Sequence, residues 1–184
     1  MSRKVLVLNI LDEEVSSFIL KLQKIFNQKP SSSIPHVTIR GPYKESAIIS
    51  ENVQKKLNDF MNNSNLEISD VGMFENDTVY IVYFKVFAKN IEKISRKIDY
   101  PKSKYGVNPH ITIYKGTSKK YAKAIYSFLK KQNIKINCDQ VGLGWCSINK
   151  KYPLLPMGCL PNLSSDRFNT YIKNAKKFAS NNQT

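Results

Sequence analysis

A five-residue phrase occurs twice in this chain, once in each half, and it contains both of the chain's histidines. The copies run from Pro35 to Ile39 and from Pro109 to Ile113, each with the sequence Pro-His-x-Thr-Ile. Aliphatic residues alternate with the histidine and the threonine, as in a β-strand with one buried face. The repetition therefore predicts two related strands and an internal duplication of the chain.

Hydrophobic periodicity elsewhere predicts the order strand, helix, strand, helix in both halves. Strands are expected at residues 5–10, 36–43, 66–74, 78–86, 110–115, 134–139 and 141–148, and helices at 12–27, 45–61, 88–98, 119–132 and 167–178. Asp12 is expected to cap the first helix, with Ile48 on the buried side of the second. The pair 66–74 and 78–86 is predicted to form a hairpin.

The charge balance favours a polyanionic partner. The chain has 29 basic and 14 acidic residues, a formal net charge of +15. Nucleic acid, a nucleotide or a phosphate-rich surface would suit this excess, although a Lys-, Asn- and Ile-rich composition also produces it. No apolar run approaches a membrane span, and the apolar start is interpreted as a first strand rather than a signal peptide. Three cysteines without metal-site spacing predict reduced thiols in a cytoplasmic protein.

Strand alternation predicts which side chains share a face. His36, Thr38 and Arg40 are expected on one side of the first motif strand. His110, Thr112 and Tyr114 are expected to share a face of the second. If the two strands lie side by side, two imidazoles and two hydroxyls surround one space.

That space suits a phosphodiester. One imidazole can take a proton from an attacking water or ribose hydroxyl while the other protonates the leaving oxygen. The Thr38 and Thr112 hydroxyls can donate to the non-bridging phosphate oxygens. Arg40 is a candidate partner for the developing phosphoryl charge. Lys115 is another, but it is expected on the opposite face and needs a bulge or the strand end to turn inward.

Aromatic side chains near the motifs are candidates for contacts to a base or ribose. Tyr43 ends the first motif strand, and Tyr114 is expected beside His110. Tyr83, Phe84 and Trp145 are interpreted instead as packing residues of their strands. Two histidines without an adjacent carboxylate cluster predict no metal and no cofactor.

The two His-x-Thr-x phrases, 36–39 and 110–113, resemble those of the 2H phosphoesterase superfamily, which includes 2′–5′ RNA ligase-like proteins and cyclic phosphodiesterases. The resemblance covers about residues 3–150. It implies that His36 and His110 act as acid and base and that Thr38 and Thr112 bind phosphate. It also implies an α+β fold of two pseudo-symmetric lobes, each an antiparallel sheet with helices outside, around a central groove. Residues 1–150 are expected to form this bilobal domain, and 151–184 a C-terminal extension with a disordered end.

The predicted function is a metal-independent phosphodiesterase acting at a ribose 2′-oxygen of a nucleotide, oligonucleotide or RNA. A 2′,3′-cyclic phosphate, a 2′–5′ linkage and a cyclic oligonucleotide all remain open as substrates, as does the reverse ligase reaction. The alternative is a nucleotide- or RNA-binding module without turnover. No membrane and no obligatory protein partner is implied.

Overall fold

The computed structural model describes residues 3–27, 33–44, 46–63, 65–95, 108–147 and 162–182. These residues form an α+β fold with two antiparallel sheets. The strands are β1 (Arg3–Ile10), β2 (His36–Lys44), β3 (Leu66–Glu75), β4 (Tyr80–Phe87), β5 (His110–Gly116), β6 (Lys135–Cys138) and β7 (Val141–Ser147). The helices are α1 (Glu13–Asn27), α2 (Glu51–Asn63), α3 (Ile91–Ser95), α4 (Lys119–Gln132) and α5 (Asp166–Asn182).

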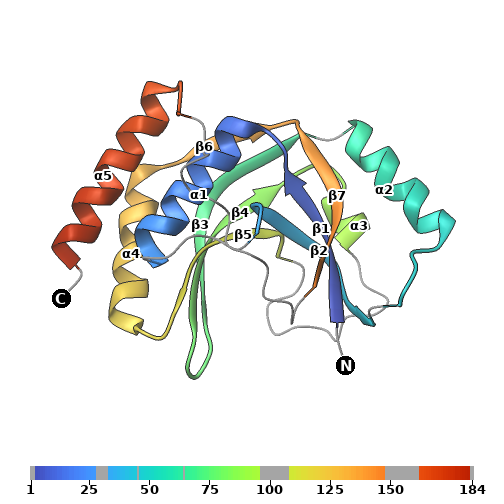
Figure 1. The fold of residues 1–184 in the computed structure, drawn as a ribbon, viewed down its shortest axis with the longest axis horizontal. Coiled ribbons are helices and arrows are strands. Elements are labelled where there is room, and N and C mark those ends of the chain that lie inside the picture. Colours follow the sequence, from blue (N-terminus) through green and yellow to red (C-terminus); the bar gives the residue numbers. More distant parts are fainter. Residues whose placement is uncertain are drawn as a thin grey trace.

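The two sheets stand side by side, with helices at both flanks (Figure 1). One has the strand order β2-β1-β7 and the other the order β5-β4-β3-β6. Both motif strands are therefore edge strands, and β2 and β5 contact each other. This arrangement brings the two halves of the chain together at the two motifs.

Each half of the chain contributes the same series of elements, and each sheet also contains a strand from the opposite half of the chain. The series β1-α1-β2-α2 is repeated as β4-α3-β5-α4. β3, which follows the first series, pairs with β4, while β7, which follows the second, pairs with β1. The expected duplication is thus present in the topology, but the halves are intertwined rather than separate.

The local signals expected at helix and turn boundaries are present. Asp12 Oδ1 accepts a hydrogen bond from the Val15 backbone N–H at 2.9 Å, which caps α1. Ser118 caps α4 in the same manner, and β3 and β4 form the predicted hairpin. The second helix differs from the prediction, because it begins at Glu51 and leaves the Ile48 side chain 94% exposed. Instead, the backbone N–H of Ala47 donates a hydrogen bond to the Lys44 carbonyl at 3.0 Å, which forms a turn in the segment where a helix was expected.

α5 is part of the same hydrophobic core as the two sheets. The Phe168 ring stacks on Phe18 of α1 with centroids 4.5 Å apart, and Phe178 stacks on Phe128 of α4 at 4.6 Å. Glu14 at the start of α1 accepts hydrogen bonds from Ser164 Oγ and the Ser165 N–H, just before α5 begins. The helix continues to Asn182, so the expectation of a disordered end is wrong for Asn181 and Asn182. The preceding segment 153–158, expected to pack across a sheet, lies outside the described residues.

Within the described ranges, no helix combines the length and the apolar character needed to cross a membrane.

Candidate functional site

The two histidines occupy the same local geometry. His36 opens β2 and its Nδ1 lies 2.8 Å from the carbonyl oxygen of Ile34. His110 opens β5 and its Nδ1 lies 2.7 Å from the carbonyl oxygen of Asn108. A carbonyl only accepts, so each Nδ1–H donates to the residue two positions upstream. The neutral tautomer is thereby fixed, and in both rings Nε2 is the atom left to exchange a proton with a ligand.

Both motif strands also contain a β-bulge at the same position, one residue after the threonine. In β2 the register skips Ile39, since Thr38 pairs with Val7 and Arg40 with Leu6. In β5 it skips Ile113, since Thr112 pairs with Tyr83 and Tyr114 with Val82. A bulge inserts an extra residue and reverses the faces of the side chains beyond it.

The bulges overturn two of the predicted shared faces. Arg40 is directed away from the site, and its Nε donates to the Ile94 carbonyl of α3 at 2.8 Å. Tyr114 is buried in the core, where its ring meets Tyr121 of α4 edge-on at 5.5 Å. The predictions that Arg40 lies beside Thr38 and Tyr114 beside His110 are therefore wrong. Simple alternation fails at both because the extra residue lies between them and the threonines.

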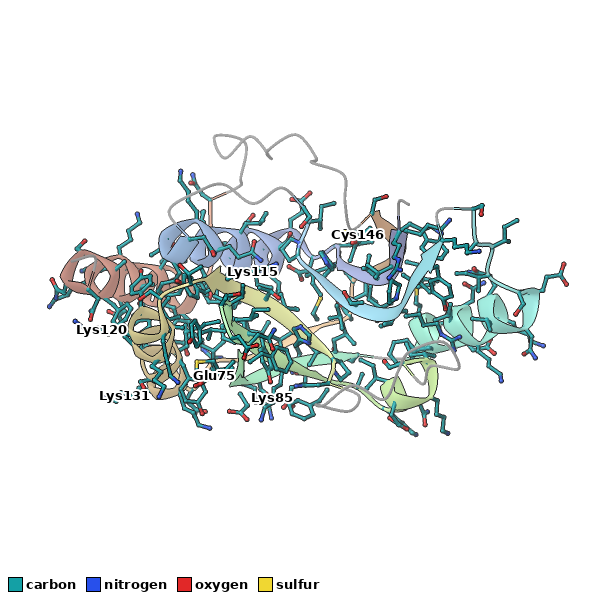
Figure 2. All side chains as sticks on the ribbon, turned by 90° about the horizontal axis from the view of Figure 1, so that it is seen from below. Glu75, Lys85, Lys115, Lys120, Lys131 and Cys146 are labelled. Carbon is teal, nitrogen blue, oxygen red and sulfur yellow. The ribbon has the colours of Figure 1, made fainter. Side chains whose placement is uncertain are left out.

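The same irregularity turns Lys115 toward the site. Lys115 pairs with Ile81, which alternates along β4 with Tyr83, the partner of Thr112. Lys115 is exposed at the end of β5, beside α1 (Figure 2). The bulge that Lys115 needs in order to face the site is thus present.

α1 holds the free edge of β5 in place. Gln23 Nε2 donates to the Thr112 carbonyl at 2.7 Å, and Asn27 Nδ2 donates to the Ile113 carbonyl at 2.8 Å. Asn27 Oδ1 in turn accepts from the Lys115 N–H at 3.0 Å. These side chains satisfy backbone groups that an edge strand leaves unpaired, including those at the bulge.

His110 is enclosed by aromatic rings. The Phe74 ring meets the imidazole edge-on at 5.1 Å, and the Tyr83 ring lies 4.8 Å from it. Phe74 and Tyr83 also stack on each other at 4.3 Å, and Asn108 Nδ2 donates to the Tyr83 hydroxyl at 2.8 Å. Tyr83 lies flat over Gly72, where an added Cβ would come within 2.3 Å of the ring. Tyr83 is a packing residue as predicted, but the group it packs against is His110.

Burial of His110 lowers its pKa below the ordinary value for histidine, because a low-polarity environment disfavours the charged imidazolium. The hydrogen bond to the Asn108 carbonyl opposes this effect. The charge of His36 lowers the pKa further. The two imidazoles are therefore close enough to influence each other electrostatically.

The two threonines have the same relation to the two histidines. Each lies two residues beyond its histidine and before the bulge, so each shares the histidine's face. Thr38 and Thr112 are both half-buried, and neither hydroxyl has a hydrogen-bond partner among the residues that the structure describes. The structure thus brings together four of the predicted site residues, His36, Thr38, His110 and Thr112, on two contacting edge strands.

A small-residue surface flanks His36 and was missed in the sequence. Gly142 and Gly144 of β7 lie on the His36 side of the sheet, since Gly142 pairs with Asn9 and Asn9 pairs with His36. The Asn9 amide lies over Gly144, where an added Cβ would be 2.5 Å from Nδ2. Leu11 lies over Gly142 and is 51% exposed. The Gly-x-Gly alternation in a strand was the available signal, because alternate residues share a face.

Tyr43 does not lie near the histidines. Tyr43 lies seven positions beyond His36 along β2, which is about 20 Å of strand. Its ring meets Trp145 of β7 edge-on at 5.7 Å. Trp145 thus packs against a side chain of its own sheet, as predicted, but it is 39% exposed and is not part of the buried core.

Lys85 lies opposite His110 across the strand pair, but its charge is already partnered. Its Nζ lies 2.6 Å from Asp70 Oδ2. This hydrogen bond, with others, lowers the Asp70 pKa from 3.8 to about 2. Lys85 and Glu75 both lie on the four-stranded sheet, away from Cys146 of the other sheet (Figure 2). Among the described residues, no three His, Cys, Asp or Glu side chains gather in a way that could hold a metal ion.

Comparisons of this chain with models of known protein families, with curated proteins and with solved structures found no match.

Proposed function

We propose that this protein is a metal-independent phosphodiesterase that acts on nucleotide or RNA phosphodiesters involving a ribose 2′-oxygen. The observation that carries the proposal is the matched pair of histidines. Both donate Nδ1–H to a carbonyl two residues upstream, and both share a face with a threonine. Two imidazoles within electrostatic reach supply the two proton transfers that such a reaction needs.

The environments of the two histidines divide their roles. His110 is enclosed by Phe74 and Tyr83, which favours the neutral imidazole that a general base requires. His36 lacks such an enclosure among the described residues and suits the proton donor to the leaving oxygen. The nucleophile is then deprotonated and attacks on the β5 side, and the leaving oxygen is protonated and departs on the β2 side.

The groups around the histidines suit the phosphate. The Thr38 and Thr112 hydroxyls can each donate to a non-bridging oxygen. Lys115, turned inward by the bulge at Ile113, is the cation best placed on this face to stabilise the developing charge. Arg40 has no part in this proposal, because α3 holds its guanidinium elsewhere.

Membership of the 2H phosphoesterase superfamily is part of the proposal. Its support is the duplicated His-x-Thr phrase together with the topology in which the phrase occurs twice, on contacting edge strands. The choice among a cyclic phosphate, a 2′–5′ linkage and a cyclic oligonucleotide is left to experiment.

The proposal is tested with a substrate panel in the presence of EDTA. The panel holds a 2′,3′-cyclic nucleotide, 2′–5′ and 3′–5′ linked oligoadenylates, and cyclic oligonucleotides. We expect cleavage of at least one class of ribose 2′-linked phosphodiester, with turnover reduced at least 100-fold in His36→Ala and in His110→Ala. Circular dichroism of both variants controls for folding. Undiminished cleavage in either folded variant would contradict the two-histidine mechanism.

The net charge of +15 favours a second candidate, a nucleic-acid-binding module without turnover. Retention of a panel member without cleavage, weakening steeply as salt concentration rises, is the result that this candidate predicts. Cleavage that depends on the histidines argues against it.

The division of roles also predicts the pH dependence. His110 must be neutral to act as a base, so kcat/KM should fall as pH decreases through its pKa, which lies below the ordinary 6.5. Phe74→Ala removes part of the enclosure, which should raise the pKa of His110. The fall in kcat/KM on the acidic side of the pH profile, its acidic limb, should therefore move to higher pH. Phe87→Ala, at an exposed phenylalanine of β4, is the matched control and should leave the limb in place. Identical pH profiles for the two variants would argue against the assignment of His110 as base.

A further inference from the structure

Three side chains form a row across one end of the three-stranded sheet. Tyr43 of β2, Lys4 of β1 and Trp145 of β7 come from all three strands. The Lys4 ammonium lies 4.2 Å from the centroid of the Trp145 ring, and Tyr43 meets that ring edge-on. This end of the sheet lies beside the N-terminus, at the bottom of Figure 1, whereas β2 begins with His36 near β5.

The row is accessible and positively charged. Trp145 is 39% exposed, although tryptophan is among the most costly side chains to leave in water. Arg3 and Lys44 pair across the strands directly beyond the row, and both are exposed. Within the described part of the chain, Arg3, Lys4 and Lys44 form no ion pair.

This combination matches what single-stranded nucleic acid requires. An exposed aromatic ring offers a stacking surface for a base of any sequence, and neighbouring cations track the phosphate backbone. Packing alone explains the contact between Tyr43 and Trp145, but it leaves unexplained why an indole with an ammonium group over its ring is exposed. A protein partner would need apolar surface around the indole. Here the Lys4 ammonium lies over the ring, and Arg3 and Lys44 add two positive charges at the same end of the sheet, on its opposite face.

We propose that the Lys4–Tyr43–Trp145 row is a second binding site, for single-stranded nucleic acid, distinct from the two-histidine site. About 20 Å of β2 separates the row from His36. The row belongs to the Leu6 face of the sheet and His36 to the opposite face, so a strand bound at both places passes over the end of the sheet. A mononucleotide cannot reach both sites, and a chain of several nucleotides can.

Trp145 is the only tryptophan in the chain, so tryptophan fluorescence reports directly on binding at the row. We would titrate the protein with a single-stranded deoxyoligonucleotide of about ten nucleotides and follow tryptophan fluorescence. DNA lacks the ribose 2′-oxygen, so binding is measured without turnover. We expect saturable quenching, and an affinity that falls about tenfold or more in Tyr43→Ala and several-fold in Lys4→Met.

Lys131→Met is the matched control, because it removes one exposed positive charge from α4, on the other side of the molecule (Figure 2). It should weaken binding less than Lys4→Met does. Trp145→Phe should retain binding of a labelled oligonucleotide and Trp145→Ala should lose it, with circular dichroism confirming that both fold. Absence of quenching, or equal losses in Lys4→Met and Lys131→Met, would overturn the second site. Neither result bears on cleavage of the substrate panel, so the two proposals fail separately.

Discussion

His36→Ala should abolish turnover of a natural ribose phosphodiester but spare turnover of an aryl ester of the same nucleotide. An alkoxide leaving group needs a proton as it departs, and a nitrophenolate does not. Loss of a general acid typically costs about 10²–10⁴-fold in rate. We therefore expect a loss of that size on the natural substrate and of less than about tenfold on the aryl ester.

His110→Ala should behave differently, because the nucleophile must lose its proton whichever group leaves. The loss should be about 10²–10⁴-fold on both substrates. Steady-state kinetics on the two substrates, with both variants, measures this directly. Rescue of His110→Ala rather than His36→Ala by the aryl ester would reverse the assigned roles while leaving the two-histidine chemistry intact.

The largest expected effect on stability is that of Phe168→Ala in α5. The Phe168 side chain is 8% exposed and stacks on the fully buried ring of Phe18. Removing a buried phenylalanine ring typically costs about 3–5 kcal/mol in the free energy of unfolding. For a chain of this length that corresponds to a fall in Tm of roughly 6–20 °C.

Lys173→Ala is the matched control for Phe168→Ala. Lys173 is an exposed residue of the same helix, and alanine has a helix propensity at least as good as that of lysine. Thermal unfolding followed by circular dichroism should show little change for Lys173→Ala. A Tm for Phe168→Ala equal to that of the control would mean that α5 contributes little to the core.

Local periodicity was sufficient to locate most elements. The helix at 119–132 and the first strand, helix and hairpin were predicted within two residues or so, because their apolar faces and caps are encoded by near neighbours. The repeated phrase alone was sufficient to select the four central residues of the candidate site. Their placement on contacting edge strands depends on pairing between segments distant in sequence.

Contacts between strands that are distant in sequence account for most of the wrong predictions about the site. Nothing in the run from His36 to Tyr43 marks the bulge at Ile39, since a bulge is defined by the partner strand, here β1. The enclosure of His110 by Phe74 and Tyr83 likewise requires β3 beside β4 and β4 beside β5. The early start expected for α2 failed because Ile48 fits a helical period but belongs to the irregular segment before Glu51.

The exchange of β3 and β7 makes this single chain equivalent to a covalently joined pair of protomers. A fragment ending at the β3–β4 turn would carry His36 and lack a partner for β3. The complementary fragment would carry His110, and its β7 would lack β1. Neither piece could complete a sheet by itself, so the site could be reconstituted only through association of the two. The hairpin turn between Glu75 and Tyr80 is therefore a natural point at which to split the molecule into a complementation pair.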